Sequence, residues 1–245
     1  RDNDGMPKLH YGQSATMDLN VRNVGSAINE AGTATLANAT GQIQIEQSQA
    51  SFPGLAPDEN ILIEDAFQIC LTDDIPDGTL VPFTITTQFD GGSFEREFEI
   101  AVVAPHIRAE LVAIDDAAGN GNGYLDAGEY ASLTFHLNNP GHYVAENPTI
   151  SLQNPEGYVR IITPETTIDD MTIGGEADIT FDVYVEYLAG EVPHVELTLA
   201  STCGNLVMEE TIRCSIGFSM ESFETAAFNP TYWTNDPVHP SLDRK

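Results

Sequence analysis

The sequence is poor in basic residues and in long apolar runs. Nine Lys and Arg residues stand against 38 Asp and Glu residues in a chain of 245, so the formal net charge is −29. Proteins that bind nucleic acid or anionic membranes use Lys and Arg contacts to phosphate, and this charge therefore argues against both kinds of partner. No apolar run approaches the ~20 residues of a membrane helix, which argues against membrane insertion. The composition suits a monomer with a well-solvated surface.

Cysteine is also scarce, and its count is odd. Only Cys70, Cys203 and Cys214 are present. Gly204-Asn205 is typical of a turn between two strands, which would place Cys203 opposite residue 206 rather than opposite Cys214. The sequence therefore predicts free, mostly buried thiols, which pack as small apolar groups.

Patterns of catalytic residues are absent from the sequence. It has no H-E-x-x-H, no G-x-S-x-G and no phosphate loop, and its six histidines are scattered. Cys203 lies beside a turn and is expected to be the most exposed thiol, but no base can be paired with it from the sequence. We therefore predict that the chain is not an enzyme. A fragment of a cysteine peptidase that uses Cys203 is the less favoured alternative.

What the sequence does contain is an internal repeat. Residues 12–45 align with residues 128–161 at a constant offset of 116, and Gly12, Gly25 and Gly41 fall on Gly128, Gly141 and Gly157. Beyond about residue 52 the offset shrinks. Phe67 then meets Phe181, and Val81-Pro82 is matched to Val192-Pro193. A period above 100 residues is that of a duplicated domain rather than of a solenoid.

Each copy has the pattern of an all-β fold. Apolar and polar residues alternate strictly in segments such as 17–21, 94–100 and 133–137, and Gly-rich turns separate them. About seven short strands per hundred residues is typical of an immunoglobulin-like β-sandwich. We predict two tandem immunoglobulin-like domains, 1–104 and 105–217, joined near Val102–Pro105. A tail, 218–245, comes after them and is interpreted as the start of a further adhesin-like domain.

One loop of the second copy has the spacing of a calcium site. Residues 115–129 alternate oxygen-bearing side chains with glycines and end on a carboxylate. With Gly123 at position 6 of an EF-hand loop, the ligand positions 3, 5, 7, 9 and 12 are filled. Ala118 stands at position 1, where Asp116 is the substitute and Asp115 a further candidate. The predicted ligands, with Tyr124 using its carbonyl, are Asp116, Asn120, Asn122, Tyr124, Asp126 and Glu129. The alternative is an ordinary polar surface turn that binds no metal.

The start of the first copy looks like a remnant of the same loop. Residues 1–5 read R-D-N-D-G, but Gln13 occupies the position of Glu129. Loss of that carboxylate weakens a calcium site, so any site in copy 1 is expected to be weak or absent.

The loop and the residues after it carry a resemblance. The phrase Asp115–Glu129 and a strand ending in Asn139-Pro140-Gly141 resemble the immunoglobulin-like regions of secreted Bacteroidetes proteins. The segment Glu221–Thr225, with Trp233 beyond it, is similar to the start of cleaved-adhesin domains. In gingipain-like cysteine peptidases such regions lie after the catalytic domain and precede cleaved-adhesin domains. The resemblance implies a secreted or cell-surface setting. It also implies that any peptidase domain lies upstream of these residues.

Two non-enzymatic functions remain open from the sequence alone. The first is a spacer in which structural calcium stiffens the junction between the two copies, since the loop comes directly after that junction in the sequence. The second is an adhesin that binds a host or cell-surface protein or a glycan through exposed aromatic side chains, with Tyr143, Tyr158 and Trp233 as the candidate anchors.

Overall fold

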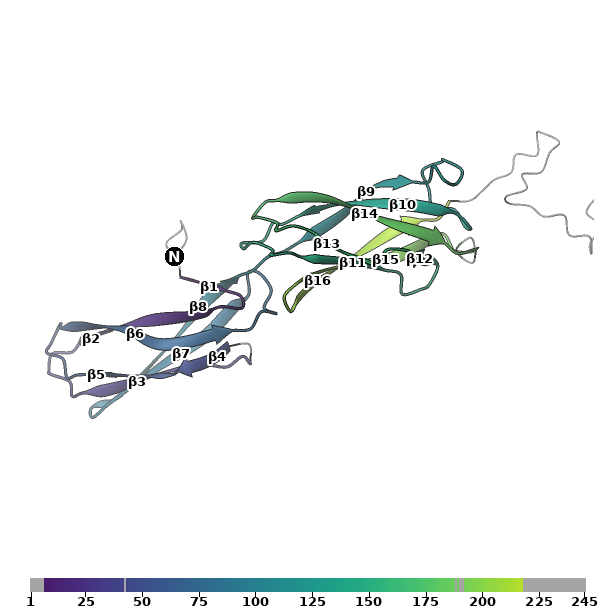
Figure 1. Ribbon diagram of the computed structural model, residues 1–245. Helices are drawn as coiled ribbons and strands as arrows, with labels where there is room; N and C mark the ends of the chain where they lie inside the picture. Colours follow the sequence, from purple (N-terminus) through teal and green to yellow (C-terminus); the bar gives the residue numbers. More distant parts are fainter. Residues whose placement is uncertain (1–6, 42, 188, 190–191, 218–245) are drawn as a thin grey trace, which may run out of the picture.

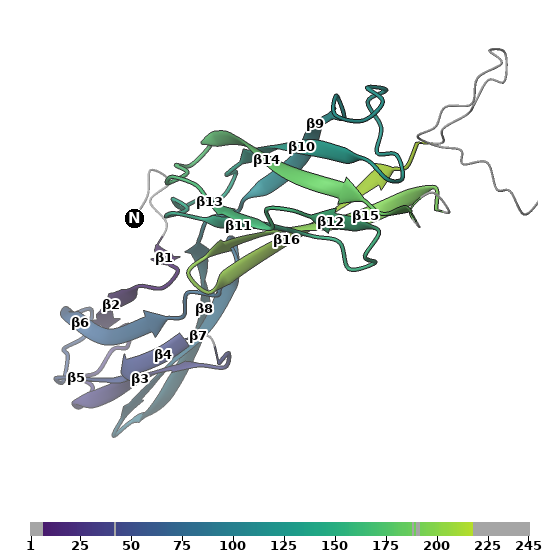
Figure 2. The ribbon, with the colours of Figure 1, turned by 45° about the vertical axis from the view of Figure 1, so that its right-hand side comes forward.

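The chain forms two β-sandwiches arranged end to end. The computed structural model describes residues 7–217 except 42, 188, 190 and 191, and Figures 1 and 2 show the two sandwiches from two sides. The predicted tail, 218–245, and the predicted remnant at residues 1–5 lie outside the described residues. The part of the chain that the structure describes holds no helix long and apolar enough to cross a bilayer.

Domain 1 contains the first eight strands, in two sheets. One sheet has the order β1-β8-β7-β3-β5 and the other the order β2-β6-β4. The strands are β1 (Lys8–His10), β2 (Ser14–Arg22), β3 (Gly32–Asn38), β4 (Ile43–Gln47), β5 (Gln49–Phe52), β6 (Asn60–Leu71), β7 (Leu80–Phe89) and β8 (Gly92–Val103). Buried side chains from both sheets, among them Phe67 and Phe83, form one core.

Domain 2 contains the other eight strands, again in two sheets. The orders are β12-β14-β10-β9 and β13-β11-β15-β16. The strands are β9 (Arg108–Asp115), β10 (Tyr130–Asn138), β11 (Thr149–Gln153), β12 (Val159–Ile161), β13 (Glu165–Thr167), β14 (Glu176–Val185), β15 (His194–Cys203) and β16 (Leu206–Ser215). A separate core, which includes Phe135 and Phe181, lies between these sheets. The predicted fold class, tandem immunoglobulin-like sandwiches, is confirmed.

The alternation seen in the sequence produces these sandwiches directly. In β10, Ala131, Leu133, Phe135 and Leu137 are buried, and the residues between them face outward. Successive side chains of a strand point to opposite faces, so this strand lays one apolar row on the core and one polar row on the solvent side.

The repeat extends from β2 to β8 in domain 1 and from β10 to β16 in domain 2. At the offset of 116, β2 falls on β10 residue for residue, and from β6 onward the offset is 114, at which β7 falls on β15. Val81 therefore corresponds to Val195, and both side chains are buried. The sequence-based match of Val81-Pro82 to Val192-Pro193 is wrong. The aligned strands β7 and β15 match Val81 with Val195 instead, although the Val-Pro dipeptide occurs at both places.

The first strand of each domain is where the copies differ. In domain 1, β1 pairs in parallel with β8, with Leu9 opposite Val102. In domain 2, β9 pairs antiparallel with β10 in the other sheet. The loop between β9 and β10 supplies the corresponding parallel contact, since Leu125 forms a parallel bridge with Ile216. Residues 8–10 of domain 1 thus occupy the place that residues 124–126 occupy in domain 2.

The two domains meet through direct side-chain contacts. The ring of Tyr143 packs edge-on against His10 and Tyr11, at centroid distances of 5.0 and 5.7 Å. Its hydroxyl accepts a hydrogen bond of 2.8 Å from Gln13 Nε2. Burial, followed by the nearby Cys203, raises the pKa of Tyr11 to about 12. Tyr143 is therefore a junction residue and not the free adhesive anchor that was predicted.

A second set of contacts holds the linker between β8 and β9. Asp77 accepts hydrogen bonds from Ala104 N at 3.0 Å and pairs with His142 Nδ1 at 2.7 Å. The buried Asn139 accepts a hydrogen bond from His106 N at 3.0 Å. A Cβ at Gly141 would lie 2.3 Å from His106 N, so only glycine fits there. These contacts fix the linker on both sides.

The pairing and the free state of the cysteines agree with the sequence-based expectation, but their exposure differs from it in one respect. Cys203 lies opposite Leu206 and all three cysteines are free. Cys203 is 1% exposed, so the expectation that it is the most exposed thiol is wrong; Cys70 is the more exposed residue. Burial raises the pKa of both Cys203 and Cys214 to about 11.

Thiol labelling should match this order. We expect iodoacetamide to modify Cys70 in the folded protein, and Cys203 and Cys214 only after unfolding, because a buried thiol with a raised pKa supplies little thiolate. Peptide mass spectrometry with and without urea reads out each site. Rapid modification of Cys203 in the folded protein would contradict its burial.

Candidate calcium site

The candidate site is the loop that joins β9 to β10. β9 begins at the linker, where Arg108 pairs with Asn138, and runs the length of the sheet to Asp115, which pairs with Ser132. The loop therefore lies at the end of domain 2 remote from domain 1 (Figure 1). The prediction that calcium here stiffens the junction of the two domains is wrong, because the strand carries the loop away from that junction.

Three carboxylates of the loop are buried together. Asp116, Asp126 and Glu129 are 4%, 2% and 8% exposed. Asp126 N donates to Glu129 Oε1 at 2.8 Å, which turns this carboxylate back into the loop. Asp126 Oδ1 and Glu129 Oε2 are buried with no hydrogen-bond partner. Buried polar atoms are normally paired, so these two carboxylate oxygens are free to accept further hydrogen bonds or to coordinate a cation.

The electrostatics of Glu129 agree with that reading. Burial is the main cause that raises its pKa, and the charges of Asp126 and Asp116 raise it further. Three carboxylates brought out of water need a positive charge if all are to stay ionised. A divalent cation supplies such a charge.

The asparagines close the loop around Asp126. Asn120 Nδ2 and Asn122 Nδ2 both donate to Asp126 Oδ2, each at 2.6 Å. A half-turn of a side-chain amide exchanges its nitrogen and oxygen, so both groups can also offer an oxygen from this place. Asp116 Oδ2 accepts from Asn122 N at 2.8 Å and so ties the start of the loop to its middle.

The backbone of the loop depends on glycine. Gly123 has φ +81°, a conformation that favours glycine, at the position where an EF-hand loop turns sharply. A Cβ at Gly119 would lie 2.1 Å from Glu129 Oε2. The loop thus leaves space beside that unpaired oxygen only because residue 119 has no side chain.

The remaining predicted ligands lie at the edge of this group. The side chain of Tyr124 is 55% exposed, which leaves its carbonyl as the group it could offer. Asp115 is exposed and accepts a hydrogen bond from Ala117 N at 3.0 Å, apart from the buried carboxylates. Among the described residues, no three His, Cys, Asp or Glu side chains converge tightly enough to hold a metal alone. An ion here would need the amide and carbonyl oxygens as well, as calcium sites generally do.

The corresponding residues of domain 1 have lost two of the carboxylates. His10 stands at the position of Asp126, and Gln13 at that of Glu129. Gln13 instead hydrogen-bonds to Tyr143, and His10 packs against the same ring. In domain 1 this end is used to contact the next domain.

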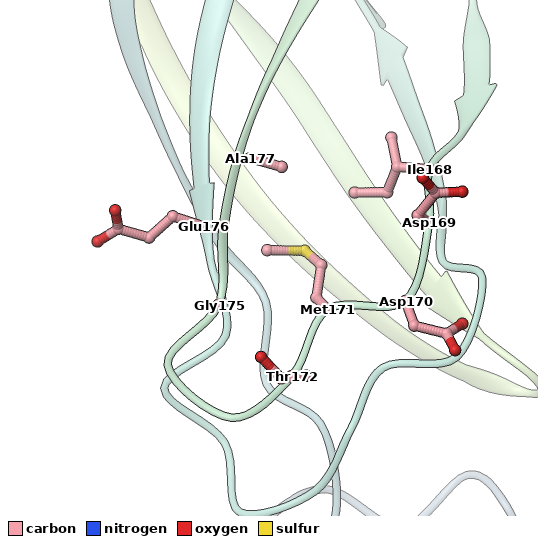
Figure 3. A pocket seen from close by; sticks show the side chains of 8 residues that line it. All are labelled: Ile168, Asp169, Asp170, Met171, Thr172, Gly175, Glu176 and Ala177. Atoms are coloured by element: carbon pink, nitrogen blue, oxygen red, sulfur yellow. The ribbon is translucent and has the colours of Figure 1, made fainter.

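Two surface depressions among the described residues offer no competing site. One is lined by Asn20, Arg22, Asp58 and Asn60 and is polar and open. The other lies between residues 168–172 and the start of β14 (Figure 3). Met171 points into it, whereas the carboxylates of Asp170 and Glu176 point away on opposite sides. Neither depression gathers a set of catalytic groups.

Comparison with known proteins gives distant structural similarities. No known protein family matches the sequence, and no curated protein matches it either. Among solved structures, a Salmonella alpha-2-macroglobulin reacted with methylamine is 12% identical, with a TM-score of 0.35, over 85% of this chain and 16% of that one. This chain therefore spans about a sixth of the length of that protein.

Two titin structures are similar in the same way. The I-band fragment I67-I69 is 9% identical, with a TM-score of 0.29, over 86% of this chain and 62% of that one. A chimeric Z1Z2-Z1Z2 tandem is 13% identical, with a TM-score of 0.30, over 86% of this chain and 95% of that one. At these scores the likeness says nothing about function.

Proposed function

We propose that this chain is a non-catalytic spacer of a secreted or cell-surface multidomain protein, and that its second domain is stabilised by calcium. The observation that carries the calcium part is the loop with three buried carboxylates and two unpaired oxygens. Calcium prefers oxygen ligands of this kind, in a loop whose glycines permit tight bends. The ion would hold the loop that joins β9 to β10 and, through Leu125, the end of β16.

The spacer part rests on the geometry of the two domains. The fixed linker and the Tyr143 contacts join two sandwiches end to end, so the pair can hold neighbouring domains of a longer protein apart. The secreted or cell-surface setting is inferred from the sequence resemblance alone.

The enzymatic alternative has lost its candidate nucleophile. A reactive cysteine needs access to substrate and a lowered pKa. Cys203 is buried and its pKa is raised to about 11.

The adhesive alternative has lost two of its predicted anchors. Tyr143 packs in the junction, and Tyr158 packs against the core of domain 2. Trp233 lies outside the described residues.

The calcium proposal is tested by thermal unfolding with Ca²⁺ and with chelator. A ligand at a hundredfold excess over its Kd stabilises the folded state by about 2.7 kcal/mol, which for a domain of this size raises the Tm by about 10 °C or more. Identical melts in the two conditions would sink the proposal. Mg²⁺ at the same concentration is the control, because its octahedral preference fits a flexible loop of mixed oxygens poorly.

The spacer proposal is tested at the junction. We expect Tyr143→Ser to broaden the distribution of interdomain angles, which small-angle scattering detects as an altered maximum dimension, without a change in circular dichroism. Leu62→Ser, an exposed apolar residue on β6, is the matched control. An unchanged scattering profile for Tyr143→Ser would show that this contact does not set the angle.

A further inference from the structure

The end of domain 1 that carries His10–Gln13 is an interface. Domain 2 covers it with Tyr143, and with Asn205, whose Nδ2 donates to Asp73 Oδ1 at 2.8 Å. This end is formed by the segment that precedes β2 together with the loop after β6.

Domain 2 has the same end, built from corresponding residues. The Leu125–Ile216 bridge corresponds to the Leu9–Val102 pair at the two offsets of the repeat. Gly128 corresponds to Gly12, and both have positive φ. A Cβ on Gly12 would contact Asp73, and a Cβ on Gly128 would contact Tyr187, so Tyr187 stands where domain 1 has its interface residue Asp73.

In domain 2 this end carries exposed aromatic side chains. Tyr130 and Tyr184 are cross-strand neighbours with ring centroids 4.9 Å apart. Burial and the adjacent Tyr187 raise the pKa of Tyr184. Tyr130 and Tyr187, which are 53% and 72% exposed, form with Tyr184 what we call the tyrosine cluster. Exposed tyrosines gathered in one place are typical of binding surfaces.

The chain leaves domain 2 at this same end. Gly217 N donates to Leu125 O at 2.9 Å. A Cβ on Gly217 would lie 2.4 Å from Asp126 Oδ1 and 3.0 Å from Tyr124 Cβ. Gly217, the last described residue before the tail 218–245, therefore lies beside the candidate calcium loop. This segment is rich in aromatic residues: Phe218, Phe223, Phe228, Tyr232 and Trp233.

We infer that the tyrosine cluster and the adjoining loop form a docking surface for residues 218–245 of the same chain. This surface of domain 2 corresponds to the surface of domain 1 that contacts domain 2. Its exposed tyrosine rings can pack against the aromatic side chains that come after Gly217 in the sequence. The inference rests on the proposed spacer function, since it continues the end-to-end arrangement by one more contact. The docked segment would then lie next to the candidate calcium loop.

Trp233 makes the inference testable in the full chain, because it is the only tryptophan. We expect its emission in the folded protein to be blue-shifted, and its quenching by acrylamide weaker, than in the chain unfolded in urea. In the double variant Tyr130→Ser, Tyr187→Ser both readings should move to the values of the unfolded chain. Phe94→Ser, which removes an exposed aromatic from domain 1, is the matched control and should leave both readings unchanged.

Three results would overturn the inference. The first is quenching of Trp233 in the folded protein that equals quenching in urea. The second is protection that the double variant leaves intact. The third is protection that grows with protein concentration alongside a dimer in light scattering, because the surface would then hold a second copy. A calcium-induced rise in Tm that survives any of these results leaves the proposed function standing, so the two failures are distinguishable.

Discussion

Replacement of Glu129 by Gln is expected to abolish the stabilisation of domain 2 by calcium. The variant loses a carboxylate whose Oε2 is buried and unpaired, at the position where an EF-hand loop has its bidentate ligand. The rise in Tm with calcium, about 10 °C or more for wild type at a hundredfold excess over Kd, should vanish. Differential scanning calorimetry with Ca²⁺ and with chelator measures both states.

The same variant should be more stable than wild type when calcium is absent. Because the pKa of Glu129 is raised in the folded state, its ionised form is disfavoured there, and stability falls as pH rises from the ordinary carboxyl pKa through the raised one. Gln removes that charge and with it the fall. Metal-free wild type should therefore gain stability on acidification through this range, and Glu129→Gln should gain less.

Two controls separate these effects from general damage. Glu165→Gln removes an exposed carboxylate on β13 and should keep the full calcium response. Gly119→Ala keeps every carboxylate but places a Cβ against Glu129 Oε2, and it should weaken the response. A normal calcium response in Glu129→Gln would remove this residue from the site.

Truncation of one core phenylalanine is expected to destabilise one domain and leave the stability of the other unchanged. Phe181 is 1% exposed and its ring meets that of Phe135 edge-on at 5.9 Å. Phe181→Ala leaves a cavity and should cost domain 2 about 3–5 kcal/mol. Phe67→Ala, at the corresponding buried position, should do the same to domain 1. Calorimetric traces should show one shifted transition in each variant, and a single transition that moves as a whole would contradict separate unfolding of the domains.

The fold was predictable because alternation and the repeat are visible in the linear sequence. The Ala131–Leu137 alternation gives β10, and a shared pattern of glycines places the second copy on the first. The Gly204-Asn205 turn placed Cys203 opposite Leu206 for the same reason. None of these inferences needs knowledge of which strands become neighbours in space.

The errors concern contacts that only the assembled sheets define. Sequence order suggested that the candidate calcium loop lies beside the linker, but the eight residues of β9 carry it to the opposite end of the domain. Tyr143 was expected to be an exposed aromatic on a loop, yet it packs against His10 and Tyr11 of the other domain. The tyrosine cluster was missed because Tyr130 and Tyr184 are distant in sequence and meet only across two strands.

The parallel pairing of β1 with β8 bears on how domain 1 would respond to tension. The pairing joins the first strand of the domain to its last strand. The paired residues are Lys8 with Ala101, Leu9 with Val102 and His10 with Val103. A pull on the chain before β1 and after β8 drags these parallel strands past one another, so their hydrogen bonds carry the load together rather than one by one. Forced unfolding is governed by the rate of unfolding rather than by equilibrium stability. This short parallel pairing is therefore expected to slow the forced unfolding of domain 1 when the two domains are under tension.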